Sequence, residues 1–98
     1  MANEIRITAD VGKYVDTVCN AFLTAHKDVE KVEYRYKGST HRGYVKVTSA
    51  FGFANYFDVT DLDKGQICLM LSAMMVNGRP RRRITDKEQM REVEKLFK

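Results

Sequence analysis

The chain has 98 residues, 44% of them hydrophobic and 31% charged, and it carries a formal net charge of +4. This composition is typical of folded domains and excludes a disordered chain, while the length predicts a single domain over 1–98. No apolar run reaches the roughly 20 residues of a membrane span, and the first residues lack a signal-peptide pattern. We therefore expect a cytoplasmic protein with no membrane partner.

The first predicted elements are a short strand and a long helix. Residues 4–8, EIRIT, alternate apolar and polar side chains, as a short edge strand does. From 10 to about 27, apolar residues recur every three to four positions, which is typical of an amphipathic helix. Its apolar stripe is expected to contain Val11, Val15, Val18 and Phe22.

The middle of the chain changes to a hydrophobic period of two and predicts three antiparallel strands, at about 31–37, 43–49 and 54–60. Alternation assigns one set of side chains to a face covered by helices and the other set to a face open to solvent. The covered set is Val32, Tyr34, Tyr36, Val45, Val47, Phe57 and Val59, and the solvent set is Arg35, Lys37, Tyr44, Lys46, Thr48, Tyr56 and Asp58.

The next predicted helix is apolar on almost every side. It follows the capping residues Thr60 and Asp61 and ends at Asn77, before a glycine. We expect the sheet to bury one side of it, and another helix or a second subunit to bury the other. Its methionines are expected in the core, with a partner or homodimer interface as the alternative.

The last predicted helix begins at a capping box of Thr85 and Glu88 and has a single apolar stripe, expected to cover the methionine-rich helix. The expected fold class is α+β. It consists of a helix, a three-stranded antiparallel sheet and then two helices, with the helices packed on one face of the sheet.

The segment NGRPRRRITDKEQ between the last two helices contains four arginines, Arg79, Arg81, Arg82 and Arg83. Guanidinium groups stay charged at neutral pH and offer forked donors that match phosphate or carboxylate oxygens. A solvated connection that balances the dipole of the preceding helix is the alternative. Because four arginines exceed that need, we expect an anion-binding site in this segment.

The predicted solvent face of the sheet is the second candidate site, because cations interleaved with aromatic rings suit nucleic acid. Ordinary outward residues on a half-buried sheet are the alternative. The hairpin tip KGSTHRG could also hold a phosphate. The expected anion-binding residues are Arg35, Lys37, Arg42 and Lys46, and the expected stacking residues are Tyr44 and Tyr56.

Catalysis has little support in the sequence. The sequence alone identifies no carboxylate partner for His26 or His41, and it contains no nucleotide or metal motif. We therefore expect no enzyme, no cofactor, no metal and no small-molecule substrate. Cys19 and Cys68 are expected to be small buried hydrophobes, and a disulfide between them requires that their helices touch and is opposed by a reducing compartment.

The predicted order of elements over 10–77, together with the hairpin STHRGYVKVT, resembles double-stranded RNA-binding domains. The resemblance lies in topology. Those domains carry a lysine cluster at the start of their second helix, where this chain has Asp61, Asp63, Lys64 and Gly65. The resemblance therefore implies an arrangement of elements and does not extend to the phosphate grip of that family.

These observations favour a non-catalytic binding module that engages nucleic acid, or the acidic surface of a nucleic-acid-binding protein machine, through the arginine segment. The alternative is a small protein–protein adaptor or inhibitor that acts through the methionine-rich helix or the acidic helices. A homodimer through the apolar helix is a further expectation.

Overall fold

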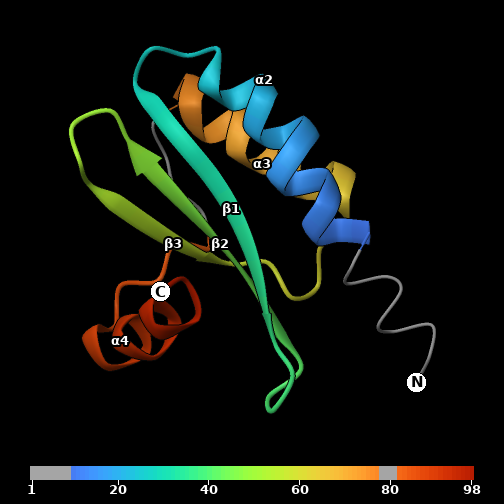
Figure 1. The fold of residues 1–98 in the computed structure, drawn as a ribbon, viewed down its shortest axis with the longest axis vertical. Coiled ribbons are helices and arrows are strands. Elements are labelled where there is room, and N and C mark those ends of the chain that lie inside the picture. Colours follow the sequence, from blue (N-terminus) through green and yellow to red (C-terminus); the bar gives the residue numbers. More distant parts are fainter. Residues whose placement is uncertain (1–9, 78–81) are drawn as a thin grey trace.

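Three layers make up the structure, a computed structural model that describes residues 10–77 and 82–98 (Figure 1). A pair of helices lies on one side of a three-stranded sheet, and a single helix lies on the other. The elements are helical residues 10–14, η1 (Val15–Cys19), α2 (Asn20–Thr24), β1 (Val29–Lys37), β2 (Arg42–Ser49), β3 (Ala54–Asp58), α3 (Lys64–Asn77) and α4 (Lys87–Leu96). The predicted strand at 4–8 lies outside the described residues.

The α+β class and the antiparallel order β1-β2-β3 are confirmed. The predicted covered face is also confirmed, since its side chains pack against the first helix and α3. That arrangement follows from the register, in which Val32 pairs with Val47 and Tyr34 with Val45. Alternation along the strands then sends these four side chains to the same face.

The first helix buries a different stripe from the one predicted. Its buried residues are Val11, Val15, Cys19 and Leu23, spaced four apart. In a regular α-helix of 3.6 residues per turn this spacing drifts around the axis, but the wider π turn of η1 reduces the drift. Val18 and Phe22, predicted inward, therefore lie outside, with 51% and 62% of their surface exposed.

The free edge of β1 is closed by two side chains of the first helix. The Val32 N–H donates to Asn20 Oδ1 at 2.8 Å, and the Tyr34 N–H donates to Asp16 Oδ1 at 2.9 Å. The distance spanned by four residues of the helix, from Asp16 to Asn20, is close to that spanned by two residues of the strand, so both side chains reach an N–H of β1. Backbone donors that would be open for pairing with another chain are occupied.

The opposite edge, at β3, carries the chain from one face of the sheet to the other. Asp58 N–H donates to the Arg82 carbonyl at 3.2 Å, and Ile84 N–H donates to the Tyr56 carbonyl at 2.8 Å. Residues 82–84 thereby extend the sheet as a short antiparallel segment beside β3. Helix α3 ends on one side of the sheet, and α4 begins on the other (Figure 1).

Helix α4 covers the face that was predicted to be open to solvent. Its stripe of Met90, Val93, Leu96 and Phe97 packs on Tyr44, Tyr56 and Ile84. The expectation that all helices share one face is therefore correct for the first helix and α3 and wrong for α4. An amphipathic helix needs one apolar surface, and the tyrosine face supplies it as well as α3 would.

The helix starts also differ from the predicted caps. At α3, Asp63 Oδ1 accepts from the Gln66 N–H at 2.8 Å, and Gln66 Oε1 accepts from the Asp63 N–H at 3.0 Å, which is a capping box. Thr60 and Asp61 are free for other contacts. At α4 the cap residue is Asp86, without a side-chain cap bond, so the predicted box of Thr85 and Glu88 is wrong. The helices of the described chain are too short or too polar to cross a bilayer.

Candidate functional site

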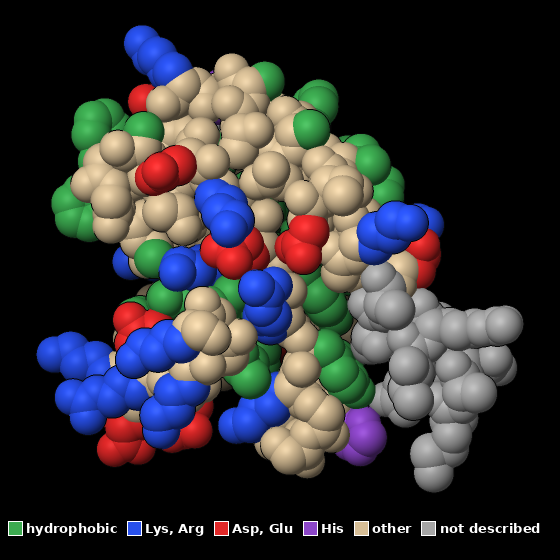
Figure 2. All heavy atoms as spheres, viewed as in Figure 1, with side chains coloured by type: hydrophobic (Ala, Val, Ile, Leu, Met, Phe, Trp, Pro, Cys, Tyr) green, Lys and Arg blue, Asp and Glu red, His purple; other side chains and the backbone are tan. Residues whose placement is uncertain are grey.

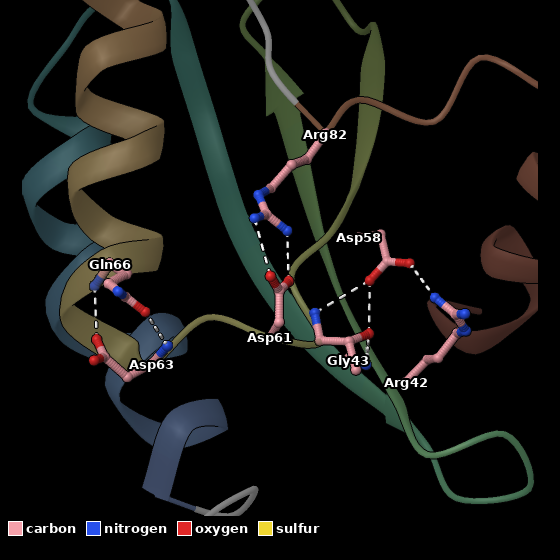
Figure 3. A network of polar contacts seen from close by, with 8 residues as sticks. Arg42, Gly43, Asp58, Asp61, Asp63, Gln66 and Arg82 are labelled. Carbon is pink, nitrogen blue, oxygen red and sulfur yellow. Dashed lines mark hydrogen bonds and ion pairs between the residues drawn. The ribbon is translucent and has the colours of Figure 1, made fainter.

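Arg42 is held by the carboxylate at the end of β3 (Figure 3). Arg42 Nη1 donates to Asp58 Oδ2 at 2.8 Å. The other oxygen, Asp58 Oδ1, accepts from the Thr60 hydroxyl at 2.6 Å and from the Thr60 N–H at 3.1 Å. Thr60 Oγ1 in turn accepts from the Gly43 N–H at 3.1 Å, which ties the end of β3 to the start of β2.

Arg82 forms a two-bond pair with Asp61 at the same end of the sheet (Figure 3). Arg82 Nη2 lies 3.0 Å from Asp61 Oδ2, and Nη1 donates to the other oxygen. This contact holds the pKa of Asp61 below its ordinary value and raises the pKa of Arg82. The Arg82 backbone takes a positive φ of 63°, which is uncommon outside glycine.

These two ion pairs line the same open hollow, which has a volume of about 460 Å³. Arg42 and Arg82, predicted from separate regions of the chain, both line it. The remaining lining residues are Thr40, His41, Asp58, Thr60 and Asp61. Because each arginine faces a carboxylate, the positive charge available to an external anion is reduced.

Three cations on the sheet make contacts inside the domain. Arg35 lies over the Phe97 ring at 5.5 Å, and Lys46 lies over the Tyr56 ring at 6.0 Å. Lys37 Nζ is 3.9 Å from a carboxylate oxygen of Glu92. Arg35 and Lys37 therefore link the sheet to α4 and its C-terminal residue Phe97, whereas the Lys46 contact joins β2 to β3 within the sheet.

The predicted stacking residues are buried. Tyr44 is 5% exposed and Tyr56 is 4% exposed, because Phe97 and its neighbours on α4 cover them. The Tyr56 and Phe97 ring centroids are 5.8 Å apart. Burial also raises the pKa of both tyrosines. The prediction of an open stacking face is wrong, because it assumed that α4 packs elsewhere.

The four loop arginines are thus not equivalent. Arg82 is paired with Asp61, and Arg79 and Arg81 lie outside the described residues. Arg83 pairs through its backbone with β3 and is exposed. No ion pair of its side chain occurs in the part of the chain that the structure describes.

A second surface lies on the outer side of the helix layer; the predicted alternative of an interface on the methionine-rich helix includes its Leu69, but its first-helix residues were predicted to be buried. We call Val18, Phe22 and Leu69 the helix-layer surface; they are 51%, 62% and 72% exposed. Beside Phe22 lies an open hollow of about 950 Å³. Its lining is Ala21, Phe22, Leu23, Ala25, His26, Lys27 and, from α3, Ser72.

The β2–β3 turn adds two further exposed rings, Phe51 at 75% and Phe53 at 70%. The turn is ordered by Ser49, whose hydroxyl oxygen accepts from both phenylalanine N–H groups at 3.2 and 3.1 Å. Gly52 takes the positive φ of 87° that the turn requires.

An Ala50 N–H bond to the Asp28 carbonyl, 3.0 Å long, joins this turn to the connection that follows α2. Figure 2 shows hydrophobic side chains gathered over the first helix and, separately, over this turn.

The sequence carried a signal for this surface. The first helix has apolar residues on two stripes, one now buried and one containing Val18 and Phe22. Helix α3 is apolar on almost every side and contacts the sheet and the first helix, which leaves Leu69 uncovered.

Comparisons with known proteins add no family to this description. A scan against protein-family models, a search of the curated proteins and a search of the solved structures gave no match to this chain. Within 10–77 and 82–98, no group of three or more His, Cys, Asp or Glu side chains is placed to hold a metal ion.

Proposed function

We propose that this protein is a non-catalytic module that binds a protein partner through the helix-layer surface. The observation that carries the proposal is the exposure of Phe22 and Leu69, two large apolar side chains on neighbouring helices. Grouped apolar exposure on a small domain is typical of an interaction site. The role is that of a small adaptor or inhibitor, now assigned to a particular face.

The shape of this face supports a protein partner. The hollow beside Phe22 is open, and its lining combines alanine, leucine and phenylalanine side chains with the polar residues His26, Lys27 and Ser72. An apolar centre with a polar rim is the usual anatomy of a protein–protein interface. The ordered turn of Phe51 and Phe53 offers two more rings at little cost in conformational entropy, because its backbone is already fixed.

The state of the cations also supports this choice over anion binding. Arg42 and Arg82 face carboxylates, and Arg35 and Lys46 pack on aromatic rings. An anion would have to compete with these contacts. A partner at the helix-layer surface would displace only water.

The test is capture of partners from the source cells by three immobilised forms of the full chain. The forms are the wild type, Phe22→Ser with Leu69→Ser, and a matched control, Glu88→Ser with Arg91→Ser, on the exposed side of α4. We expect a stoichiometric protein that the wild type and the control retain and the first variant loses. Retention of the same protein by all three forms would rule out this face.

Light scattering on the purified chain separates self-association from binding of another protein. A dimer mass that falls to a monomer in the Phe22→Ser, Leu69→Ser variant would make the partner a second copy. A monomer mass for both forms would leave a different protein as the partner.

Engagement of nucleic acid, or of an acidic protein surface, through the arginines is the second candidate. It is favoured by one observation, that Arg42 and Arg82 line the same hollow beside the hydroxyls of Thr40 and Thr60. Fluorescence anisotropy with single- and double-stranded oligonucleotides across a salt series tests it. Each phosphate contact should contribute a slope of about −0.9 to log affinity against log salt on duplex DNA.

Two variants make that measurement specific. Arg42→Ala and Arg82→Ala should each weaken binding and reduce the salt slope by about one contact. The candidate fails if the chain binds neither strand form at low salt, or if both variants bind as the wild type does.

A further inference from the structure

Two cysteines from different elements meet at the interface between the first helix and α3. Cys19 lies in η1 and is completely buried, whereas Cys68 lies in α3 and is partly exposed. Cys68 packs against the core cluster that contains Cys19, and its presence contributes to the raised pKa of Cys19, so the two side chains are neighbours. The condition for a cross-link, that the two helices touch, is met.

We propose that Cys19 and Cys68 form a reversible intramolecular disulfide when an oxidant reaches Cys68. With hydrogen peroxide, the Cys68 sulfur attacks one oxygen, so that an S–O bond forms as the O–O bond breaks and the first water leaves. The Cys19 sulfur then attacks the Cys68 sulfenic acid. The S–S bond forms, the S–O bond breaks, and the Cys19 proton leaves with the oxygen as a second water.

The environments of the two thiols assign their order of reaction. Only Cys68 has surface open to an oxidant, so it reacts first. Burial, together with the neighbouring Cys68, raises the pKa of Cys19 to about 12, which keeps this thiol protonated and unreactive toward outside reagents. Cys19 is the resolving partner because it is buried away from the oxidant but packed beside Cys68, and it gives up its proton to the departing oxygen as its sulfur closes the bond.

The cross-link would tie the two helices together directly beneath the helix-layer surface. Val18 precedes Cys19, and Leu69 follows Cys68. Oxidation would thus fix the relative position of the two helices that present these side chains. The inference does not depend on the proposed partner, because it can be tested on the isolated chain.

The test uses the purified full chain treated with hydrogen peroxide, followed by thiol titration in denaturant and intact mass measurement. We expect both thiols to be lost together, with a mass decrease of two hydrogen atoms that dithiothreitol reverses. Peptide mapping of the wild type should show the Cys19 and Cys68 peptides joined. An oxidised Cys68 with Cys19 still present as a free thiol would overturn the proposal.

Two variants identify the roles of the cysteines. Cys68→Ser should leave Cys19 resistant to oxidation in the folded chain. Cys19→Ala should leave Cys68 as a sulfenic acid that a dimedone probe traps, with no mass loss. If Cys68→Ser allows rapid oxidation of Cys19, the assigned order of reaction is wrong.

Discussion

The two sides of the sheet are covered by helices of opposite character. Helix α4 has one apolar stripe, which is packed on Tyr44 and Tyr56, and a charged outer side. The helix layer is apolar inside and, at Val18, Phe22 and Leu69, apolar outside as well. Helix α4 shows that this chain can complete a layer with a polar exterior. The packing of the core therefore does not require the apolar exterior of the helix layer, and the proposed binding site would account for it.

Leu69 and Leu71 show the contrast within α3. They have the same side chain and are two positions apart, which places them on opposite sides of the helix. Leu69 is 72% exposed, whereas Leu71 is fully buried. The inner leucine is expected to carry stability, and the outer one is expected to carry binding.

The largest expected effect is at the inner position. Leu71→Ala should lower the free energy of unfolding by about 2–5 kcal/mol, because it removes buried methyl groups and leaves a cavity. Urea unfolding measures this loss. A change below about 1 kcal/mol would mean that the inner side of α3 is not the core position that the contrast requires.

A smaller loss is expected on the other side of the sheet. Val93→Ala should cost about 2 kcal/mol, since Val93 is 2% exposed but has a smaller side chain and belongs to a smaller cluster. The Tyr44 and Tyr56 ring signals in NMR spectra should shift, while the methyl signals of Leu71 should not. Widespread shifts in the helix layer would contradict the separation of the two clusters.

A still smaller effect is expected at the β1 edge. Asn20→Ala removes the acceptor of the Val32 N–H and should cost about 1 kcal/mol. Asn20→Asp keeps an acceptor oxygen and serves as the control. Hydrogen exchange at the Val32 amide should accelerate in the first variant only; equal exchange in both would show that this bond does not protect the edge.

The smallest effect is expected from the exposed Asp61–Arg82 pair, through pH. Because Arg82 holds the pKa of Asp61 below its unfolded value, the pair contributes stability above the ordinary aspartate pKa, and this contribution is lost as pH falls through the lowered value. The melting temperature of the wild type should fall more over this acid range than that of Arg82→Ala. The difference should shrink in high salt. If the melting temperatures of the wild type and Arg82→Ala fall equally over this acid range, the Asp61–Arg82 pair does not contribute to stability.

The parts of the fold that could be predicted from the sequence are those in which a local pattern had one physical solution. Val45 and Phe57 alternate with polar neighbours, so their face was fixed by the strand period. The stripe of Met90 and Val93 was equally clear. The sequence did not determine which apolar surface this stripe would pack on, since α3 and the tyrosine face of the sheet were both suitable.

The candidate site was less predictable, because it depends on contacts between distant residues. The pairing of Arg82 with Asp61 and of Arg42 with Asp58 cannot be derived from local patterns. The exposure of Phe22 depends on a single π turn, which changes the stripe that faces the sheet. Periodicity detects an amphipathic helix, but a shift of one position moves a residue from the core to the surface.

The most direct test of the account is the urea unfolding free energy of the Phe22→Ser, Leu69→Ser variant. If the helix-layer surface is a binding face, the variant should unfold within about 1 kcal/mol of the wild type, because both side chains are already exposed to water. A loss of several kcal/mol, comparable with that of Leu71→Ala, would show that these residues support the fold and would contradict the account.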